Sequence, residues 1–213
     1  MLLLAAFLLL VCYDSFALAR GVAARAARVV DGDTLWLADG DKVRLAGLDA
    51  PESGHPEEGR AAQFYAAEAT ALLSSLVTGR ELAVESLGRD GYGRLLGLVW
   101  VDGALVNEAL LEQGAAFYLY YPDRPAGLDG RLLAAQVRAM DAGRGFWPRI
   151  MSLPAARKPW VGNARSGRAF PAGSREAKRI AASHRIYFLT LTEAMRKGYA
   201  PARQLSPWPA SGE

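Results

Sequence analysis

Two short acidic segments carry side chains that could perform chemistry together. The first is DGDT, residues 31–34, and the second is DAPE, residues 49–52. Taken singly, each segment is more often a simple turn, because aspartate side chains stabilise turns and proline stiffens them. If Asp33 and Asp49 meet at one end of a sheet, their carboxylates repel each other unless a cation or protons compensate. Their oxygen atoms are hard ligands that suit Ca²⁺ or Mg²⁺ and not zinc.

Two arginines would extend this chemistry to phosphate. Arg44 lies in KVRLAGL, residues 42–48, and Arg94 ends the glycine-rich segment DGYGR, residues 90–94. A guanidinium group pairs bidentately with phosphate oxygens, although a surface salt bridge is the simpler interpretation of either arginine alone. Two arginines, a cation and a carboxylate base are the parts that phosphodiester hydrolysis needs. The cation and the arginines would stabilise transition-state charge, and Glu52 would activate a water for in-line attack.

The elements that must position these residues follow from the hydrophobic pattern. Strands are expected at residues 22–30, 34–38, 42–48, 81–87 and 95–101, with Asp-Gly turn signals after the second and the fifth. Apolar residues from Ala61 to Leu76 recur at three- and four-residue spacing, which predicts a helix that Gly79 ends. Shorter helices are expected from Val106 to near Gly114 and from Leu128 to Gly143. This order predicts a mainly β protein with capping α-helices (α+β), built on a five-stranded OB-fold barrel, an architecture that commonly binds nucleic acids.

Composition and charge limit the classes of protein. The 213 residues are 51% hydrophobic, enough for one sizeable core, and a single cysteine excludes a disulfide framework or a zinc site built mainly from thiolates. Residues 20–152 contain 14 basic and 18 acidic residues, a net charge of −4. Residues 153–213 contain 11 basic and 3 acidic residues, a net charge of +8. A basic unit beside an acidic body indicates a polyanionic partner or merely a charged, soluble surface.

The N-terminal segment has the pattern of a signal peptide. Residues 2–11 are an unbroken apolar run, and the small-x-small pattern ALA at residues 17–19 matches a cleavage site. We therefore expect residues 1–19 to be a signal peptide, with Arg20 at the mature N-terminus and a secreted or periplasmic protein as the result. The alternative is an uncleaved membrane anchor.

The stretch from Val29 to about Trp147 resembles staphylococcal nuclease and its thermonuclease relatives. The matching motifs are VVDGDT, VRLAGLDAPE, DGYGR, VDGALVNEALLEQGAA and GFWP, in the family's order and at its spacing. The resemblance implies a calcium-dependent nuclease domain at residues 20–152. Such an enzyme hydrolyses DNA and RNA with little sequence specificity and leaves 3′-phosphate ends.

The resemblance also assigns roles to individual residues. Asp33 and Asp49 would be the side-chain ligands of Ca²⁺, and Ala50 would give a backbone carbonyl. Glu52 would be the general base, and Arg44 and Arg94 would bind phosphate. The remaining matches are Tyr92 and Tyr120, as tyrosines that contact the nucleotide, and Asp31, as a carboxylate near the metal.

The last part of the chain is expected to form a C-terminal unit, residues 160–213, after a linker at residues 153–159. Within it, Thr190 to Glu193 fits a capping box that opens a short helix. Its segments VGNARSGRAF, AKRIAASHRIYF and EAMRKGYAPA resemble the zinc-binding module of Ada-type DNA repair proteins. The zinc ligands are missing, because Ala172 or Gly173, Ala202 and Gln204 stand where that module has cysteines. We therefore expect no structural zinc.

What remains is a small basic module with a patch formed by Arg165, Arg168, Arg175, Lys178, Arg179 and Arg185, or a disordered tail. A folded module would assist polyanion binding. Deleting residues after Ser152 would then raise KM and flatten its salt dependence.

Two other classes of function compete with an enzyme. A catalytically inactive OB-fold module would bind nucleic acid without cleaving it, and an envelope-anchored adaptor would use the barrel as a scaffold. The presence of the complete set of acidic and arginine residues favours the nuclease. We expect a monomer without a stable protein partner.

Overall fold

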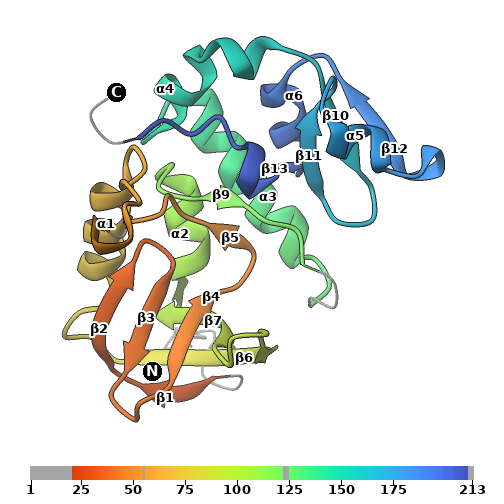
Figure 1. Ribbon diagram of the computed structural model, residues 1–213. Helices are drawn as coiled ribbons and strands as arrows, with labels where there is room; N and C mark the ends of the chain where they lie inside the picture. The colour runs from red at the N-terminus through yellow and green to blue at the C-terminus, as the bar shows by residue number, and fades with distance from the viewer. Residues whose placement is uncertain (1–20, 55, 122–124, 211–213) are drawn as a thin grey trace, which may run out of the picture.

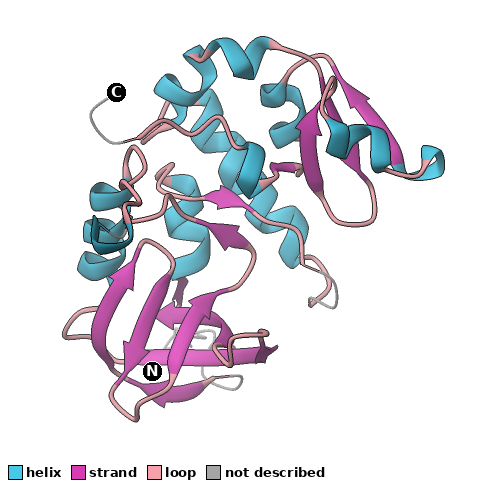
Figure 2. Cartoon of the chain, viewed as in Figure 1, coloured by secondary structure: helices cyan, strands magenta, loops and turns pink. Residues whose placement is uncertain are grey.

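The computed structural model describes residues 21–54, 56–121 and 125–210 as a mixed α/β protein (Figures 1 and 2). A curled sheet forms one part of the molecule, helices cover its end and one side, and a second, smaller sheet lies beyond them. Within the described residues, no helix is long and apolar enough to cross a membrane. The predicted signal peptide lies outside the described residues.

The larger sheet has the strand order β1-β6-β7-β4-β3-β2, with β8 paired to β7. Its two ends, β1 and β2, follow each other in the chain with only Arg25 between them, so the sheet curls round to bring one chain segment to both ends. The prediction of one strand at residues 22–30 is wrong for this reason: the segment divides so that each part pairs with a different strand. The strands are β1 (Val22–Ala24), β2 (Ala26–Asp31), β3 (Thr34–Leu37), β4 (Lys42–Leu45), β6 (Leu82–Arg89), β7 (Leu95–Val101) and β8 (Ala104–Leu105).

The segment after β4 leaves this sheet, contrary to the strand predicted over residues 42–48. Gly47 has a φ of 80°, a left-handed conformation that glycine adopts without steric cost. The chain then forms β5 (Leu48–Asp49), which pairs antiparallel with β9 (Phe117–Tyr118) as a separate two-stranded sheet. The turn at Gly47 therefore decides where Asp49 lies.

The helices follow the predicted periodicity but not all of the predicted bounds. Tyr65 has a left-handed φ of 72°, and α1 therefore begins at the next residue, not at Ala61. Gly79, with a φ of 73°, follows the end of this helix as predicted. The helices of this part are α1 (Ala66–Val77), α2 (Val106–Glu112), α3 (Leu128–Asp141) and α4 (Trp147–Ser152), with a 3-10 turn η1 (Pro56–Glu58).

Residues 160–210 form a four-stranded sheet with two short helices. The strand order is β12-β10-β11-β13, antiparallel except for the parallel pair β11 and β13. The predicted capping box is present: the Glu193 N–H donates to Thr190 Oγ1 at 3.0 Å, and the Leu189 N–H donates to Glu193 Oε2 at 2.8 Å. The elements are β10 (Trp160–Asn163), β11 (Arg168–Pro171), α5 (Arg175–Arg179), η3 (Ala182–His184), β12 (Arg185–Phe188), α6 (Leu191–Arg196), β13 (Ala200–Pro201) and η4 (Arg203–Leu205).

The C-terminal unit shares a hydrophobic core with the helices that precede it. Phe146 and Trp147 of the nuclease-like part pack in one cluster with Trp160, Leu191 and Trp208. Residues 153–159 include the 3-10 turn η2 (Pro154–Arg157), which is largely exposed but whose Ala156 is buried in the same cluster.

The end of the described chain runs back from the C-terminal unit across the molecule toward α1 and α4 (Figure 1). Two hydrogen bonds fix it there. The Phe64 N–H donates to the Pro209 carbonyl at 2.9 Å, and Trp208 Nε1 donates to the Phe64 carbonyl at 3.2 Å. The last segment is therefore tied to the loop that follows residues 49–52.

Candidate active site

The first acidic segment makes a tight turn between β2 and β3. The Asp33 N–H donates to Asp31 Oδ1 at 3.1 Å, which is the aspartate turn that the sequence already suggested. A Cβ atom on Gly32 would lie 2.7 Å from the Cβ atoms of both Ala50 and Ala69, so only glycine fits between these segments. The Ala50 N–H in turn donates to Asp33 Oδ2 at 3.0 Å. The turn therefore joins the two acidic segments.

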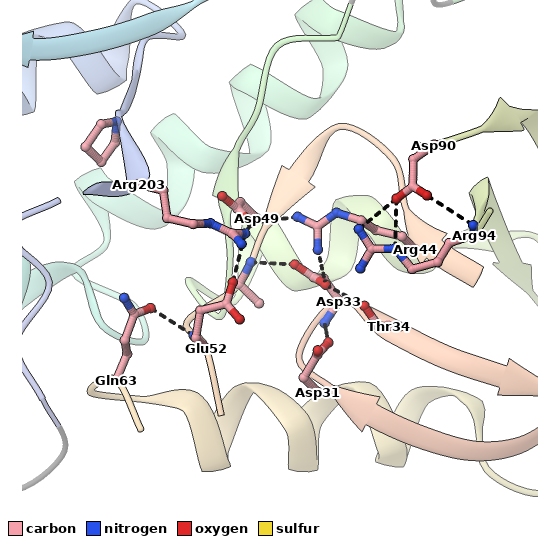
Figure 3. A network of polar contacts seen from close by, with 12 residues as sticks. Asp31, Asp33, Thr34, Arg44, Asp49, Glu52, Gln63, Asp90, Arg94 and Arg203 are labelled. Carbon is pink, nitrogen blue, oxygen red and sulfur yellow. Dashed lines mark hydrogen bonds and ion pairs between the residues drawn. The ribbon is translucent and has the colours of Figure 1, made fainter. Parts of the chain in front are cut away.

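Arg44 bridges the two buried aspartates (Figure 3). It lies opposite Thr34 in the pairing of β3 and β4. Its Nη1 donates to Asp33 Oδ1 at 2.5 Å, and its Nη2 donates to Asp49 Oδ1 at 2.6 Å. Arg44 is 7% exposed, and both aspartates are buried as well. A buried charge is costly unless it is paired, and here both carboxylates pair with the guanidinium group of Arg44.

Burial and neighbouring charges shift the pKa values of Asp33 and Arg44 in opposing ways. Burial raises the pKa of Asp33 to about 7, against the lowering effect of Arg44, and the carboxylates of Asp31 and Asp49 raise it further. Burial alone would lower the pKa of Arg44, but Asp33 and Asp49 raise it, so this side chain stays charged. Arg44 alone leaves these two carboxylates with an excess of negative charge, which two arginines of the C-terminal unit reduce.

Glu52 stands beside this group with its side chain partly open to solvent, 42% exposed. Its backbone is held from both directions: the Glu52 N–H donates to Gln63 Oε1 at 2.8 Å, and the Gln63 N–H donates to the Glu52 carbonyl at 2.9 Å. A held backbone with an accessible carboxylate is what a general base requires. No local motif marks Gln63 as a functional residue.

Arg94 reaches the same face of the sheet from the turn that leads into β7. Arg44 is opposite Leu96 in the parallel pair of β4 and β7, and Arg94 precedes Leu96 by two residues, the spacing that returns a side chain to the same face. Asp90 orients it, because Arg94 Nε and Nη2 lie 2.8 and 2.7 Å from Asp90 Oδ2. Asp90 is a residue that the sequence interpretation did not single out, although it begins the motif DGYGR.

The two predicted tyrosines lie in different surroundings. Tyr92 is 87% exposed, with its ring 5.3 Å from the guanidinium carbon of Arg94, where a base could stack. Tyr120 packs on Gly167 of the C-terminal unit, where an added Cβ would lie 2.4 Å from the Tyr120 Cβ. Tyr121, next in the chain, interacts electrostatically with Arg168, which lies 3.8 Å from Asp49. The role of Tyr120 stays a prediction.

Two arginines of the C-terminal unit reach the acidic group. Arg203 Nη2 lies 3.0 Å from Asp49 Oδ1 and 2.8 Å from Glu52 Oε1, and Arg168 Nη1 lies 3.8 Å from Asp49 Oδ2 (Figure 3 shows Arg203). Arg168 was expected only as part of a basic patch, and Arg203 was missed. No local pattern marks Arg203, because its partners lie about 150 positions earlier in the chain.

The donor atoms at the site fit a hard cation. Asp33, Asp49, Glu52 and the Ala50 carbonyl offer oxygen only, the ligand type that Ca²⁺ and Mg²⁺ prefer. Among the residues that the structure describes, no three histidine, cysteine or acidic side chains are grouped closely enough to hold a metal ion. A cation at this site would therefore rely on two side-chain carboxylates, the carbonyl and water.

Comparison with known proteins identifies relatives of this chain. A family model described as "Staphylococcal nuclease homologue" matches residues 42–149, which include Arg44, Asp49, Glu52 and Arg94. An uncharacterized endonuclease from Escherichia coli O157:H7 is 35% identical over 142 residues, which cover 64% of this chain and 82% of that protein.

Two eukaryotic proteins are also similar. A probable staphylococcal-like nuclease from Oryza sativa subsp. japonica is 35% identical over 125 residues, 58% of this chain and 33% of that protein. A probable endonuclease from Pyricularia oryzae is 34% identical over 111 residues, 49% of this chain and 42% of that protein. The family match ends at residue 149, so it lends no support to an Ada-type zinc module in the C-terminal unit.

Proposed function

The chain belongs to the staphylococcal nuclease family, and on this premise we propose that it is a calcium-dependent nuclease that hydrolyses phosphodiester bonds of DNA and RNA. The observation that carries the proposal is the buried bridge of Arg44 between Asp33 and Asp49, with Glu52 beside it and Arg94 on the same face of the sheet. We further propose an OB-type barrel as the scaffold, little sequence specificity, 3′-phosphate products and a secreted or periplasmic location.

In this proposal the chain's own side chains do the following work. Glu52 accepts a proton from a water molecule, whose oxygen forms the new bond to phosphorus while the bond to the 5′ oxygen breaks. Arg44 and Arg94 donate hydrogen bonds to the phosphate oxygens and stabilise the charge that they gain. Arg44 uses two of its five N–H donors for the aspartates, so a phosphate would take others. Asp90 keeps Arg94 in a fixed direction.

Asp33, Asp49 and the Ala50 carbonyl would hold Ca²⁺. When bound, the ion supplies positive charge next to the phosphate. The assignment is supported by the two buried carboxylates, which lie close enough for Arg44 to bridge them and which repel each other.

The experiment that tests the function is the release of acid-soluble nucleotides from single-stranded DNA and from RNA by the purified protein. We expect cleavage with Ca²⁺ and none with chelator, and a Mg²⁺ arm tests the choice of ion. Arg94→Ala should lower the rate by about two orders of magnitude. Arg80→Ala, which removes an exposed arginine paired with Asp102, is the matched control and should cleave like the unmodified protein.

Failure of the folded protein to cleave under every condition would favour the alternative of a nucleic-acid-binding module or adaptor. Equal loss of activity in Arg94→Ala and Arg80→Ala would show that Arg94 has no special role.

A further inference from the structure

The C-terminal unit places positively charged side chains next to the acidic groups of the candidate active site. Residues 20–152 carry a net charge of −4, so a nucleic acid that approaches this part alone meets repulsion. Residues 153–213 carry +8, and Arg168 and Arg203 bring part of that charge directly to Asp49. At the junction of the two parts, a bound polyanion would therefore lie near the catalytic candidates and near arginines that offset the negative charge of residues 20–152.

The two arginines differ in how firmly they are held. Arg168 is mostly buried and donates to the Pro201 carbonyl at 3.3 Å, so its position is set by the C-terminal unit. The side chain of Arg203 is 58% exposed, and its recorded partners, Asp49 and Glu52, are both acidic groups of the site. The pair with Glu52 is exposed on both sides and therefore contributes little, and Asp49 keeps Arg44 as a partner when Arg203 moves away. Arg203 can therefore exchange its carboxylates for a phosphate at little cost.

The location of Arg203 is a fixed property of the fold. It begins the turn η4, which leads into the segment that Trp208 and Pro209 attach to Phe64. A hollow between the two parts is lined by Asp49, Glu52, Gln63, Phe117, Arg203 and Trp208. In Figure 3, Arg203 enters the site from the side of the C-terminal unit, and Arg94 lies on the opposite side of Arg44 and Asp49.

From this arrangement we propose that Arg203 is a substrate-binding residue that holds a phosphate adjacent to the one being cleaved. The proposal rests on the proposed nuclease function and adds a second phosphate site to it. Without substrate, the guanidinium group of Arg203 rests on Asp49 and Glu52. With a polynucleotide bound, it turns to the neighbouring phosphate, which also frees Glu52 Oε1 to accept a proton.

If Arg203 binds a second phosphate, the effect of removing it on kcat/KM should depend on the length of the substrate. A dinucleoside monophosphate has one phosphodiester and cannot use Arg203, whereas a single-stranded oligonucleotide can. We expect Arg203→Ala to lower kcat/KM on the oligonucleotide by roughly three- to tenfold and to leave kcat/KM on the dinucleoside monophosphate within about twofold. Arg203→Lys should recover part of the loss. Arg196→Ala, which removes an arginine of the same C-terminal unit that pairs with Asp141 and lies outside the basic patch, is the control of equal charge.

Binding is measured separately, in chelator, by fluorescence anisotropy of a labelled single-stranded oligonucleotide over a range of salt concentrations. Loss of one phosphate contact should lower the slope of log K against log salt by about 0.7 in Arg203→Ala and not in Arg196→Ala. This readout also serves if the unmodified protein cleaves neither substrate: the nuclease function then fails, and the slope still decides whether Arg203 binds phosphate.

Three results would overturn the proposal. Equal losses on both substrates would make Arg203 a residue that only positions Asp49 and Glu52. A gain of activity in Arg203→Ala on both substrates would make it a blocking group. An unchanged salt slope in Arg203→Ala would show that it contacts no phosphate.

Discussion

The indole of Trp208 meets the ring of Phe146 edge to face, with 4.6 Å between the ring centroids. Trp208 lies near the end of the described chain, and Phe146 belongs to the part that carries the catalytic candidates. The cluster around them also contains Phe117, next to the Tyr118 that pairs with Leu48 in β5. The last described residues therefore complete a core that the nuclease-like part uses.

This core adds a second expected effect of removing the C-terminal unit. Deletion after Ser152 is expected to raise KM and flatten its salt dependence, and it would also uncover Phe146 and Trp147 and destabilise the whole protein. A milder test is Trp208→Ala, which should lower the free energy of unfolding by about 3 kcal/mol or more. Urea denaturation measures it, with the exposed Leu189→Ala as a control that should stay within about 0.5 kcal/mol. A loss for Trp208→Ala no larger than that of the control would contradict the shared core.

The buried bridge of Arg44 makes a second prediction. Arg44→Met leaves the buried carboxylate of Asp33 without its guanidinium partner, while Asp49 keeps Arg203, and breaking a buried pair costs about 3–5 kcal/mol. We expect a loss of this size in chemical denaturation at neutral pH in chelator. Arg25→Met removes an exposed arginine paired with Glu81 and should change stability by less than about 1 kcal/mol. Similar small losses in both variants would mean that the bridge contributes little.

Calcium should stabilise the folded protein even when no substrate is present. A ligand that binds only the folded state at a hundredfold excess over its Kd adds about 2.7 kcal/mol to the free energy of unfolding. Thermal melting with Ca²⁺ and with chelator measures the difference. Asp49→Asn should abolish it, and Asp39→Asn, in the exposed turn between β3 and β4, should retain it. A shift that persists in Asp49→Asn would place the ion elsewhere.

The pair of Asp90 and Arg94 should depend on pH in a definite direction. Burial would raise the pKa of Asp90, but the hydrogen bonds from Arg94 and from the Tyr92 N–H outweigh it and lower the pKa. A carboxyl group with a lowered pKa in the folded state stabilises the protein above its unfolded pKa of about 3.9, and this contribution is lost as the pH falls through the folded value.

Asp90→Asn should therefore destabilise the protein at pH 6, and the difference from the unmodified protein should shrink as the pH is lowered below about 4. Melting temperatures of both proteins from pH 3 to pH 7 measure this. A difference that stays constant over the whole range would show that the charge of Asp90 is not what holds Arg94.

Sequence reasoning recovered those features that depend on neighbouring residues. The turns at residues 39–40 and 102–103, the strand at residues 95–101 and the capping box of Thr190 and Glu193 were predicted from local patterns, and the structure has them. The predicted strand ends that were wrong lie where the segment pairs with a strand distant in the sequence. The strand expected over residues 42–48 ends at Leu45, because Leu48 and Asp49 pair with β9, far along the chain.

By itself, the sequence determined which chemistry is available: two acidic turns, a glutamate and two arginines, in the order and spacing of the staphylococcal nuclease family. Only the tertiary structure decided that Arg44 lies between Asp33 and Asp49, that Asp90 directs Arg94, and that Arg203 joins Asp49 and Glu52. The physical reason is that short-range patterns record backbone preference and the burial of one face. A contact across about 150 residues arises from packing, here from the attachment of Trp208 to the core, and leaves no periodic trace in the chain.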